Sequence, residues 1–337
     1  MASIGGWNAG TASFSAIASK PSVRSSFVRN CVSLAGKGFD GIDIDWEYPA
    51  STEKQAFVNL LAELKSALKP KGKLLTAAVN SGAWQTSQSY NILSVCGNLD
   101  LINLMTYDFQ WPSTTTGTNA GYSQVNSAAG LWVSGGCSPS KLVLGLASYG
   151  YDFNLINPSS HGVGASATGA TSISYRDICK KLKSSGWTTI RSDQTPYSYK
   201  GTEWISFDDV TSLKAKLNIV SSRNLAGAFF WSTDLDDYDN FCGTGYFPLI
   251  SSVSKALGAS SGGSVTLKTT TPKTANPTTK PSNIACSDDG FFPYPGDCTR
   301  FYRCVSGTAF TFNCPSGLGY NPAFSGCDYK ANIAGCA

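Results

Sequence analysis

Short apolar runs alternate with longer helical patterns along the first 256 residues of the chain. Each run is four to six residues long, which suits a strand buried on both faces. No apolar run approaches the roughly 18 residues of a membrane-spanning helix, so no membrane span is expected. We predict six strands, at residues Ala2–Gly5, Gly41–Trp46, Leu74–Val79, Leu101–Met105, Leu142–Ala147 and Gly227–Trp231.

Two helices are predicted from apolar residues that repeat at helical spacing. The first covers Val23–Leu34 and buries Val23, Phe27, Cys31 and Leu34. The second covers Thr52–Leu68 and buries Phe57, Leu60, Leu61, Leu64 and Leu68, with Ser51 as the expected N-cap. Strands that alternate with helices predict an α/β fold with a parallel sheet, either closed into a barrel or open and doubly wound. No glycine-rich phosphate-binding motif follows a strand, so nothing supports nucleotide binding.

The composition changes from Leu257 to Ile284. These 28 residues contain no aromatic and no acidic side chain, and 17 of them are Ser, Thr, Pro or Gly. Such a segment cannot bury enough apolar surface to offset the entropy of ordering it. We therefore divide the chain into a first domain at 1–256, an extended linker at 257–284 and a small second domain at 285–337.

The cysteines are unevenly distributed. Six of the 11 lie in the 53 residues from 285 to 337, a length that is marginal for stability on hydrophobic burial alone. This density predicts three disulfides formed in an oxidising compartment, and spacing alone leaves all fifteen pairings open. Zinc is a poor alternative, because this segment has no CxxC pair and no histidine.

Charge and histidine content exclude several functions. The net charge is +4 and charged residues make up 14% of the chain, which gives no support for binding nucleic acid or an anionic membrane. The single histidine, His161, makes a Ser-His-Asp triad or a histidine-based zinc site a poor hypothesis.

The strand around Phe39–Pro49 carries the most informative pattern. In an extended chain, alternate residues point to opposite faces. The acidic face comprises Asp43, Asp45 and Glu47, and the apolar face comprises Ile42, Ile44 and Trp46. Asp40 has the opposite parity, and we expect it to be structural.

Three neighbouring acids on one buried face cannot all ionise cheaply, so at least one pKa should rise. A carboxyl that stays protonated near neutral pH can act as a general acid. Glu47 is the best candidate, because barrel enzymes place their chemistry at the carboxyl ends of strands. A solvated acidic edge and a divalent-metal site are the alternatives, and the flanking isoleucines argue against the solvated edge.

This strand resembles the DGxDxDxE signature of glycoside hydrolase family 18, the chitinases, which are TIM-type (β/α)8 barrels. The fixed positions match at Asp40, Gly41, Asp43, Asp45 and Glu47, and the flanking Trp46 and Tyr48-Pro49 resemble the animal-type enzymes. The resemblance extends over almost all of 1–256. Its other segments are Ser3–Trp7, Leu104–Phe109, Leu144–Gly150 and Gly227–Asp237, which resemble the third, sixth, seventh and eighth strands.

The resemblance implies retaining hydrolysis of β-1,4-linked N-acetylglucosamine polymer, assisted by the substrate's own acetamido group. Glu47 would protonate the glycosidic oxygen, Asp45 would orient the acetamido N–H, and Asp43 would tune Asp45. Tyr107 would bind the acetamido oxygen, and Asp108 would support this network. No metal or organic cofactor is implied.

The resemblance also implies the walls of the substrate cleft. Trp231 would lie under the sugar that is cleaved, Trp7 and Tyr149 would line the groove, and Met105 would lie near the acetamido pocket. Residues from about 151 to 224 resemble a small α+β insertion that deepens the cleft. A disulfide between Cys179 and Cys242 is implied there.

The second domain has the spacing C-x11-C-x5-C-x9-C-x12-C-x8-C and ten aromatic residues. It is similar to the peritrophin-A-like chitin-binding domain, carbohydrate-binding module family 14. The implied disulfides are Cys286–Cys304, Cys298–Cys336 and Cys314–Cys327. The expected partners are therefore chitin and N-acetylglucosamine oligomers. The alternative is a disulfide-rich module that binds protein.

The family match begins at the third strand, so the first two βα units of the barrel have no counterpart in this chain. The segment Met1–Trp7 also shows neither a charged leader nor an apolar signal segment. We expect an N-terminally incomplete version of a secreted, extracellular, monomeric enzyme, and a short isoform is the alternative. A lectin that has lost catalysis and a purely structural chitin-binding protein are the rival functions, and Glu47 favours the enzyme. Cys31 is expected to be a buried free thiol, while Cys96 and Cys137 are left unassigned.

Overall fold

The computed structural model describes residues 1–110, 113–258, 286, 290–305, 308–314, 318–322 and 326–336. The chain divides into two compact units, Met1–Gly262 and Gly263–Ala337. The predicted linker lies outside the described residues from 259 onward. Among the described residues, no helix combines the length and the apolar character needed to span a membrane.

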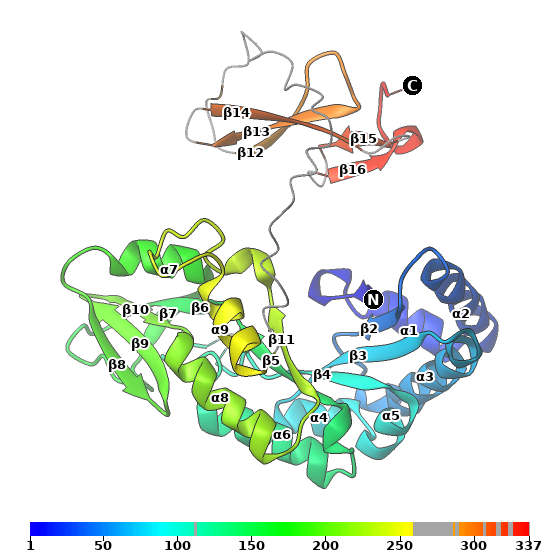
Figure 1. Cartoon of the computed structure of the whole chain (residues 1–337), viewed down its shortest axis with the longest axis horizontal. Helices are drawn as coiled ribbons and strands as arrows, with labels where there is room; N and C mark the ends of the chain where they lie inside the picture. Colours follow the sequence, from blue (N-terminus) through cyan, green and yellow to red (C-terminus); the bar gives the residue numbers. More distant parts are fainter. Residues whose placement is uncertain are drawn as a thin grey trace. The chain divides into compact units, whose positions relative to one another are not determined.

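The first unit is built on one parallel sheet of six strands (Figure 1). The strands are β1 (Ala2–Gly5), β2 (Gly41–Asp45), β3 (Leu74–Asn80), β4 (Leu101–Met105), β5 (Leu142–Ala147) and β11 (Gly227–Trp231). All six coincide with the predicted strands to within one residue at each end. Their order is β1-β2-β3-β4-β5-β11 without reversal, whereas a doubly wound sheet reverses direction at a switch point. The topology is therefore that of a barrel.

Helices lie on the outer side of these strands (Figure 1). They are α1 (Ala12–Ser19), α2 (Pro21–Ala35), α3 (Lys54–Leu68), α4 (Ala83–Ser89), α5 (Ile92–Asn98), α6 (Tyr122–Ser134), α8 (Val210–Ser222) and α9 (Pro248–Ala256). The predicted apolar face of α3 is completely buried. Beneath it, the Trp46 ring stacks on Phe14 at 5.4 Å and meets the edge of Phe57 at 5.7 Å. The apolar side of the acidic strand is thus part of the core.

Two local predictions were wrong. Val23 is 40% exposed, and α2 instead buries Arg24, Val28, Cys31 and Ala35. The Arg24 guanidinium can be buried because it pairs with Glu63 at 2.7 Å and donates to the Ala18 carbonyl at 2.7 Å. Ser51 is not a helix cap: it lies in a 3-10 turn, where the Ala50 N–H donates to the Glu53 carboxylate at 2.8 Å.

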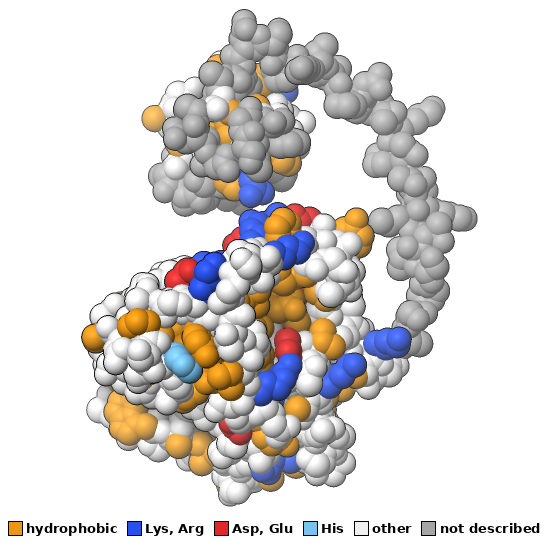
Figure 2. All heavy atoms as spheres, turned by 90° about the vertical axis from the view of Figure 1, so that its left-hand side faces the viewer, with side chains coloured by type: hydrophobic (Ala, Val, Ile, Leu, Met, Phe, Trp, Pro, Cys, Tyr) orange, Lys and Arg blue, Asp and Glu red, His pale blue; other side chains and the backbone are white. Residues whose placement is uncertain are grey.

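A five-stranded antiparallel sheet is inserted between β5 and α8. Its strands are β6 (Tyr149–Leu155), β7 (Ala167–Ser174), β8 (Thr188–Ser192), β9 (Thr195–Lys200) and β10 (Glu203–Ser206), and helix α7 (Tyr175–Leu182) packs on it. Figure 2 views this side of the molecule, where hydrophobic side chains interrupt a largely uncharged surface. The sheet ends at Ser206, and α8 then packs against α6 and α9 on the barrel.

Disulfides occur in both units. Cys179–Cys242 ties α7 to the segment after β11, and it is the pairing that the family resemblance implies. Cys96–Cys137 joins α5 to the loop after α6 and was not predicted. Cys31 is a buried free thiol, as expected.

The second unit contains a three-stranded sheet and a hairpin. The sheet comprises β12 (Gly290–Pro293), β13 (Arg300–Val305) and β14 (Thr308–Asn313), and the hairpin comprises β15 (Leu318–Asn321) and β16 (Gly326–Tyr329). The structure contains Cys286–Cys304 and Cys298–Cys336, as the resemblance implies. Cys314 is also disulfide-bonded, while the side chain of Cys327 lies outside the described part.

Candidate active site

Strand β2 delivers the acidic residues to the carboxyl edge of the parallel sheet. Every residue from Gly41 to Asp45 is buried, and Asp43 and Asp45 are each 8% exposed. Their side chains face away from the apolar core that receives Ile42, Ile44 and Trp46. This burial excludes the solvated acidic edge considered from the sequence.

Asp43 is held by hydrogen bonds from three neighbouring strands. Its Oδ2 accepts from the Ser3 hydroxyl of β1 at 2.8 Å. Its Oδ1 accepts from the Thr76 hydroxyl of β3 at 2.5 Å and from the Asn103 amide of β4 at 3.1 Å. Three donors around one carboxylate fix its orientation and stabilise its negative charge. Asp43 is thus a hydrogen-bond acceptor of fixed orientation beneath the two acids that follow it.

Asp45 has the opposite environment. Its Oδ1 is buried and has no hydrogen-bond partner among the described residues. Burial is the main cause that raises its pKa from 3.8 to about 7, and the nearby charges of Glu47 and Asp43 contribute to the same rise. A buried acceptor without a donor is unfavourable unless a ligand supplies the donor. Asp45 is therefore suited to accept a hydrogen bond from a bound molecule.

Glu47 also has a raised pKa. The main cause is burial, and the charge of Asp108 acts in the same direction. Hydrogen bonds from the Tyr48 side chain and the Trp7 backbone N–H oppose this rise. The expectation that at least one acid in this strand has a raised pKa is confirmed for both Asp45 and Glu47. A carboxyl of this kind retains its proton to higher pH and can donate it.

Tyr107 and Asp108 follow the end of β4. The buried Tyr107 hydroxyl has a pKa well above its usual value, because of burial and the charges of Asp108, Asp45 and Glu47. Its hydroxyl is therefore neutral and is able to donate a hydrogen bond near these acids. The charges that raise its pKa show that the predicted residues Asp45, Glu47, Tyr107 and Asp108 form one electrostatic cluster.

Asp108 is fixed by the predicted Tyr149 and by two residues that the sequence analysis did not predict, Asn119 and Tyr151. It has a positive φ of 62°, and its N–H donates to the Asn119 side chain at 2.8 Å. Its Oδ1 accepts from the hydroxyls of Tyr149 at 2.5 Å and Tyr151 at 2.7 Å. Tyr149 is only 5% exposed, so its hydroxyl supports Asp108 while its ring is largely buried. The two tyrosines share one face of β6, and strand alternation could have revealed the second.

Two tryptophans lie open to solvent at the same edge. Trp231 ends β11 and is 52% exposed, and Trp7 follows β1 and is 59% exposed. Large aromatic rings offer a flat apolar face on which a sugar ring can stack. Both are available to stack on a ligand.

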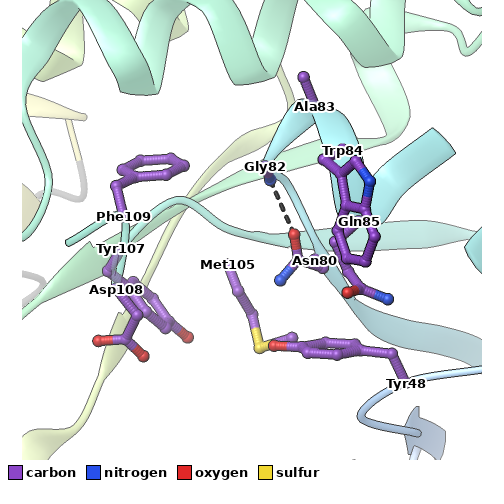
Figure 3. A pocket seen from close by; sticks show the side chains of 10 residues that line it. All are labelled: Tyr48, Asn80, Gly82, Ala83, Trp84, Gln85, Met105, Tyr107, Asp108 and Phe109. Atoms are coloured by element: carbon purple, nitrogen blue, oxygen red, sulfur yellow. Dashed lines mark hydrogen bonds between the residues drawn. The ribbon is translucent and has the colours of Figure 1, made fainter. Parts of the chain in front are cut away.

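A cavity of about 400 Å³ opens beside the acidic cluster. Figure 3 shows Met105 and Tyr48 between two walls, with Trp84 and Gln85 on one side and Tyr107, Asp108 and Phe109 on the other. Three predicted site residues, Met105, Tyr107 and Asp108, line it. Tyr48 and Trp84 were missed; a tryptophan within the otherwise polar helix Ala83–Ser89 was the available signal.

Among the described residues, no group of three or more His, Cys, Asp or Glu side chains is arranged to hold a metal ion. The chemistry available to the cluster is proton donation by a carboxyl, hydrogen bonding by a second carboxyl and a tyrosine, and stacking on aromatic rings.

The singly wound parallel sheet, with acids on one strand and aromatic rings at its carboxyl edge, defines a barrel glycoside hydrolase. The chain belongs to the family described as "Glycosyl hydrolases family 18", which matches residues 1–236. A second family, described as "Chitin binding Peritrophin-A domain", matches residues 286–336. Both family resemblances are thereby confirmed.

The chain is similar to proteins with named activities. It is 32% identical to mouse chitotriosidase-1, over 98% of this chain and 80% of that protein. The structure of Ostrinia furnacalis Group IV chitinase in complex with allosamidin has a TM-score of 0.73 and 33% identity, over 76% of this chain and 78% of the other. Human YKL-39, described as a pseudo-chitinase with retained chitooligosaccharide binding, has a TM-score of 0.72 and 31% identity, over 76% and 79%. The fold class is therefore the TIM-type barrel, of which six parallel strands are found among the described residues.

Proposed function

We propose that this protein hydrolyses chitin by a retaining mechanism in which the substrate's acetamido group is the nucleophile. One observation carries the proposal. The unpartnered, buried Asp45 Oδ1 belongs to a cluster with Glu47, and both acids have raised pKa values. That arrangement pairs a proton donor with an acceptor that awaits a donor from the ligand.

Glu47 is the general acid. Its raised pKa favours the protonated form, which transfers its proton to the glycosidic oxygen as the bond from that oxygen to the anomeric carbon breaks. The acetamido carbonyl oxygen then bonds to the anomeric carbon and forms an oxazolinium ion. Water opens this ring after losing a proton to the Glu47 carboxylate, which restores the acid and retains the anomeric configuration.

Asp45 accepts a hydrogen bond from the acetamido N–H and thereby holds the acetamido carbonyl oxygen against the anomeric carbon. Positive charge develops on the acetamido group as the ring forms, and Asp45 and Asp43 stabilise it. The neutral Tyr107 hydroxyl donates to the acetamido oxygen, and Asp108 supports this network. Trp231 lies under the cleaved sugar, with Trp7 and Met105 beside it.

We assign one function to each domain proposed from the sequence. Residues 1–256, with the insertion at about 151–224, carry out catalysis, residues 257–284 are a linker, and residues 285–337 bind chitin. Disulfides in both units are typical of proteins that fold outside the reducing cytosol. This supports a secreted, extracellular protein. We propose further that it is a monomer that binds chitin and N-acetylglucosamine oligomers.

A chitin-binding protein without catalysis is the second candidate, favoured by the similarity to YKL-39. Release of soluble N-acetylglucosamine oligomers from chitin by the full chain separates the two. We expect release by the unsubstituted chain and its loss in Glu47→Gln, with chitin binding retained because the substitution removes the proton and little else. Binding without release by the unsubstituted chain would establish the second candidate. Unchanged release by Glu47→Gln would refute the role of Glu47.

A further inference from the structure

Trp84 is the most exposed large hydrophobic side chain among the described residues, at 73%. It lies in helix α4, directly after β3, at the edge of the sheet that carries the acidic cluster. An indole ring in water forgoes the hydrophobic free energy that burial would provide. Its position on the wall of the cavity beside this cluster makes a bound ligand the natural partner.

The other residues around the cavity indicate the chemistry of that ligand. None of the ten lining residues is basic, so an anionic ligand has no counter-charge there. Asn80 and Gln85 contribute side-chain amides on the same side as Trp84, and Phe109 contributes a second ring opposite (Figure 3). Amides that hydrogen-bond and rings that stack suit a neutral, polyhydroxylated ring with an apolar face.

Met105, Tyr107 and Asp108 are placed around the acetamido group of the cleaved sugar, so the cavity adjoins that sugar on their side. The position of Tyr48 indicates which sugar lies in the part of the cavity that Trp84 lines. Tyr48 lines the cavity and directly follows Glu47, whereas Trp231 and Trp7 are not among its lining residues. The oxygen that Glu47 protonates departs with the leaving sugar. The leaving sugar therefore lies on the Glu47–Tyr48 side of the ring that stacks on Trp231.

We propose that Trp84 is the aromatic platform of a subsite for the N-acetylglucosamine unit on the leaving-group side of the cleaved bond, an inference that rests on the proposed hydrolysis. The C–H face of that unit stacks on the indole ring, and the Asn80 and Gln85 amides hydrogen-bond to its polar edge. The subsite recognises the substrate through a residue that takes no part in the chemistry.

Comparing two substrates tests the subsite. Chitopentaose can place a sugar on the leaving-group side, whereas 4-nitrophenyl chitobioside presents an aryl group there if its two sugars fill the other side. We expect Trp84→Ala to lower kcat/KM for chitopentaose about tenfold more than for the aryl substrate, which corresponds to about 1.4 kcal/mol. Trp84→Phe, which keeps a ring, should recover part of the difference. Phe39→Ala is the matched control, because this 38% exposed ring precedes β2 at the opposite edge of the sheet and should alter neither rate.

Equal losses on the two substrates, or no loss on either, would overturn the subsite. The proposed hydrolysis fails separately, if the unsubstituted chain cleaves neither substrate. In that case calorimetric binding of chitopentaose still decides the role of Trp84: weaker binding by Trp84→Ala than by Phe39→Ala supports the platform, and equal binding refutes it.

Discussion

Replacing Asp45 with asparagine should stabilise the first unit at neutral pH while impairing its activity. The folded chain raises the pKa of this carboxyl from 3.8 to about 7, chiefly through burial. Below pH 4 the carboxyl is protonated in both the folded and the unfolded chain, so it does not lower the free energy of unfolding. Between pH 4 and 7 the unfolded chain loses the proton more readily, and stability falls as pH rises. Above pH 7 both are ionised and the cost is complete.

The magnitude follows from about 1.4 kcal/mol for each pKa unit between the two states. At pH 5 the unfolded carboxyl is ionised and the folded one is not, so Asp45 costs about 2 kcal/mol; at pH 8 it costs about 4 kcal/mol. Asparagine has nearly the same shape and no titrating proton. The stability gained by Asp45→Asn should therefore be about 2 to 3 kcal/mol larger at pH 8 than at pH 5.

Urea unfolding followed by tryptophan fluorescence measures this in the full chain. All eight tryptophans lie at or before Trp231, so the signal reports on the first unit alone. Asp43→Asn is the matched control, two residues earlier on the same strand. It brings an amide donor toward the three donors that now face Asp43, and it should destabilise by roughly 1–3 kcal/mol at both pH values.

A stability change in Asp45→Asn that is the same at pH 5 and pH 8 would refute the buried-carboxyl reasoning. A lower free energy of unfolding for Asp45→Asn than for the unsubstituted chain at pH 8 would refute it as well. The gain should be accompanied by a loss of chitin hydrolysis, because the substituted side chain no longer carries the charge that stabilises the developing oxazolinium ion. Stability gained and activity lost at one residue is the signature of a group retained for chemistry.

Two further predictions concern buried groups. Tyr151→Phe removes one of the two hydroxyls that donate to Asp108 Oδ1. Because a hydrogen bond to a charged group contributes about 1.5–3 kcal/mol, this substitution should lower kcat on chitopentaose about tenfold with little change in KM. A fall in unfolding free energy without a fall in kcat would show a merely structural role. Cys31 is 2% exposed, and burial raises the pKa of its thiol to about 12. A thiol reagent should therefore fail to label the native chain at pH 8 and should label one thiol per chain after denaturation without reductant. Rapid labelling of the native chain would contradict the burial of Cys31, and three labelled thiols would contradict the Cys314–Cys327 pairing.

The strands and the acidic cluster were predictable because local signals determine them. An apolar run bounded by helices leaves little choice of register, and period-two alternation then assigns each side chain of β2 to a face. The same alternation could have placed Tyr151 beside Tyr149. The doubly wound alternative could be rejected only from the strand order, which depends on which distant segments pair.

Where prediction failed, a partner distant in the sequence decided the outcome. The buried face of α2 is rotated because Glu63, on another helix, neutralises a buried Arg24. Cys96 and Cys137 are 41 residues apart, and no spacing rule joins them. Helix α3 is preceded by a 3-10 turn, in which the Glu53 carboxylate accepts a hydrogen bond from the Ala50 N–H, and Ser51 does not cap the helix.

The cavity beside the cluster illustrates why a family signature leaves part of a site unpredicted. The signature names the residues that touch the reacting bond, and their chemistry constrains residue type strongly. A stacking platform needs only a flat ring at roughly the right height, so many positions on the surrounding loops and helices can supply it. Trp84 became visible only when β3 and β4 placed α4 opposite Tyr107 and Phe109 across one cavity. A platform of the kind proposed for Trp84 must therefore be found from the assembled fold.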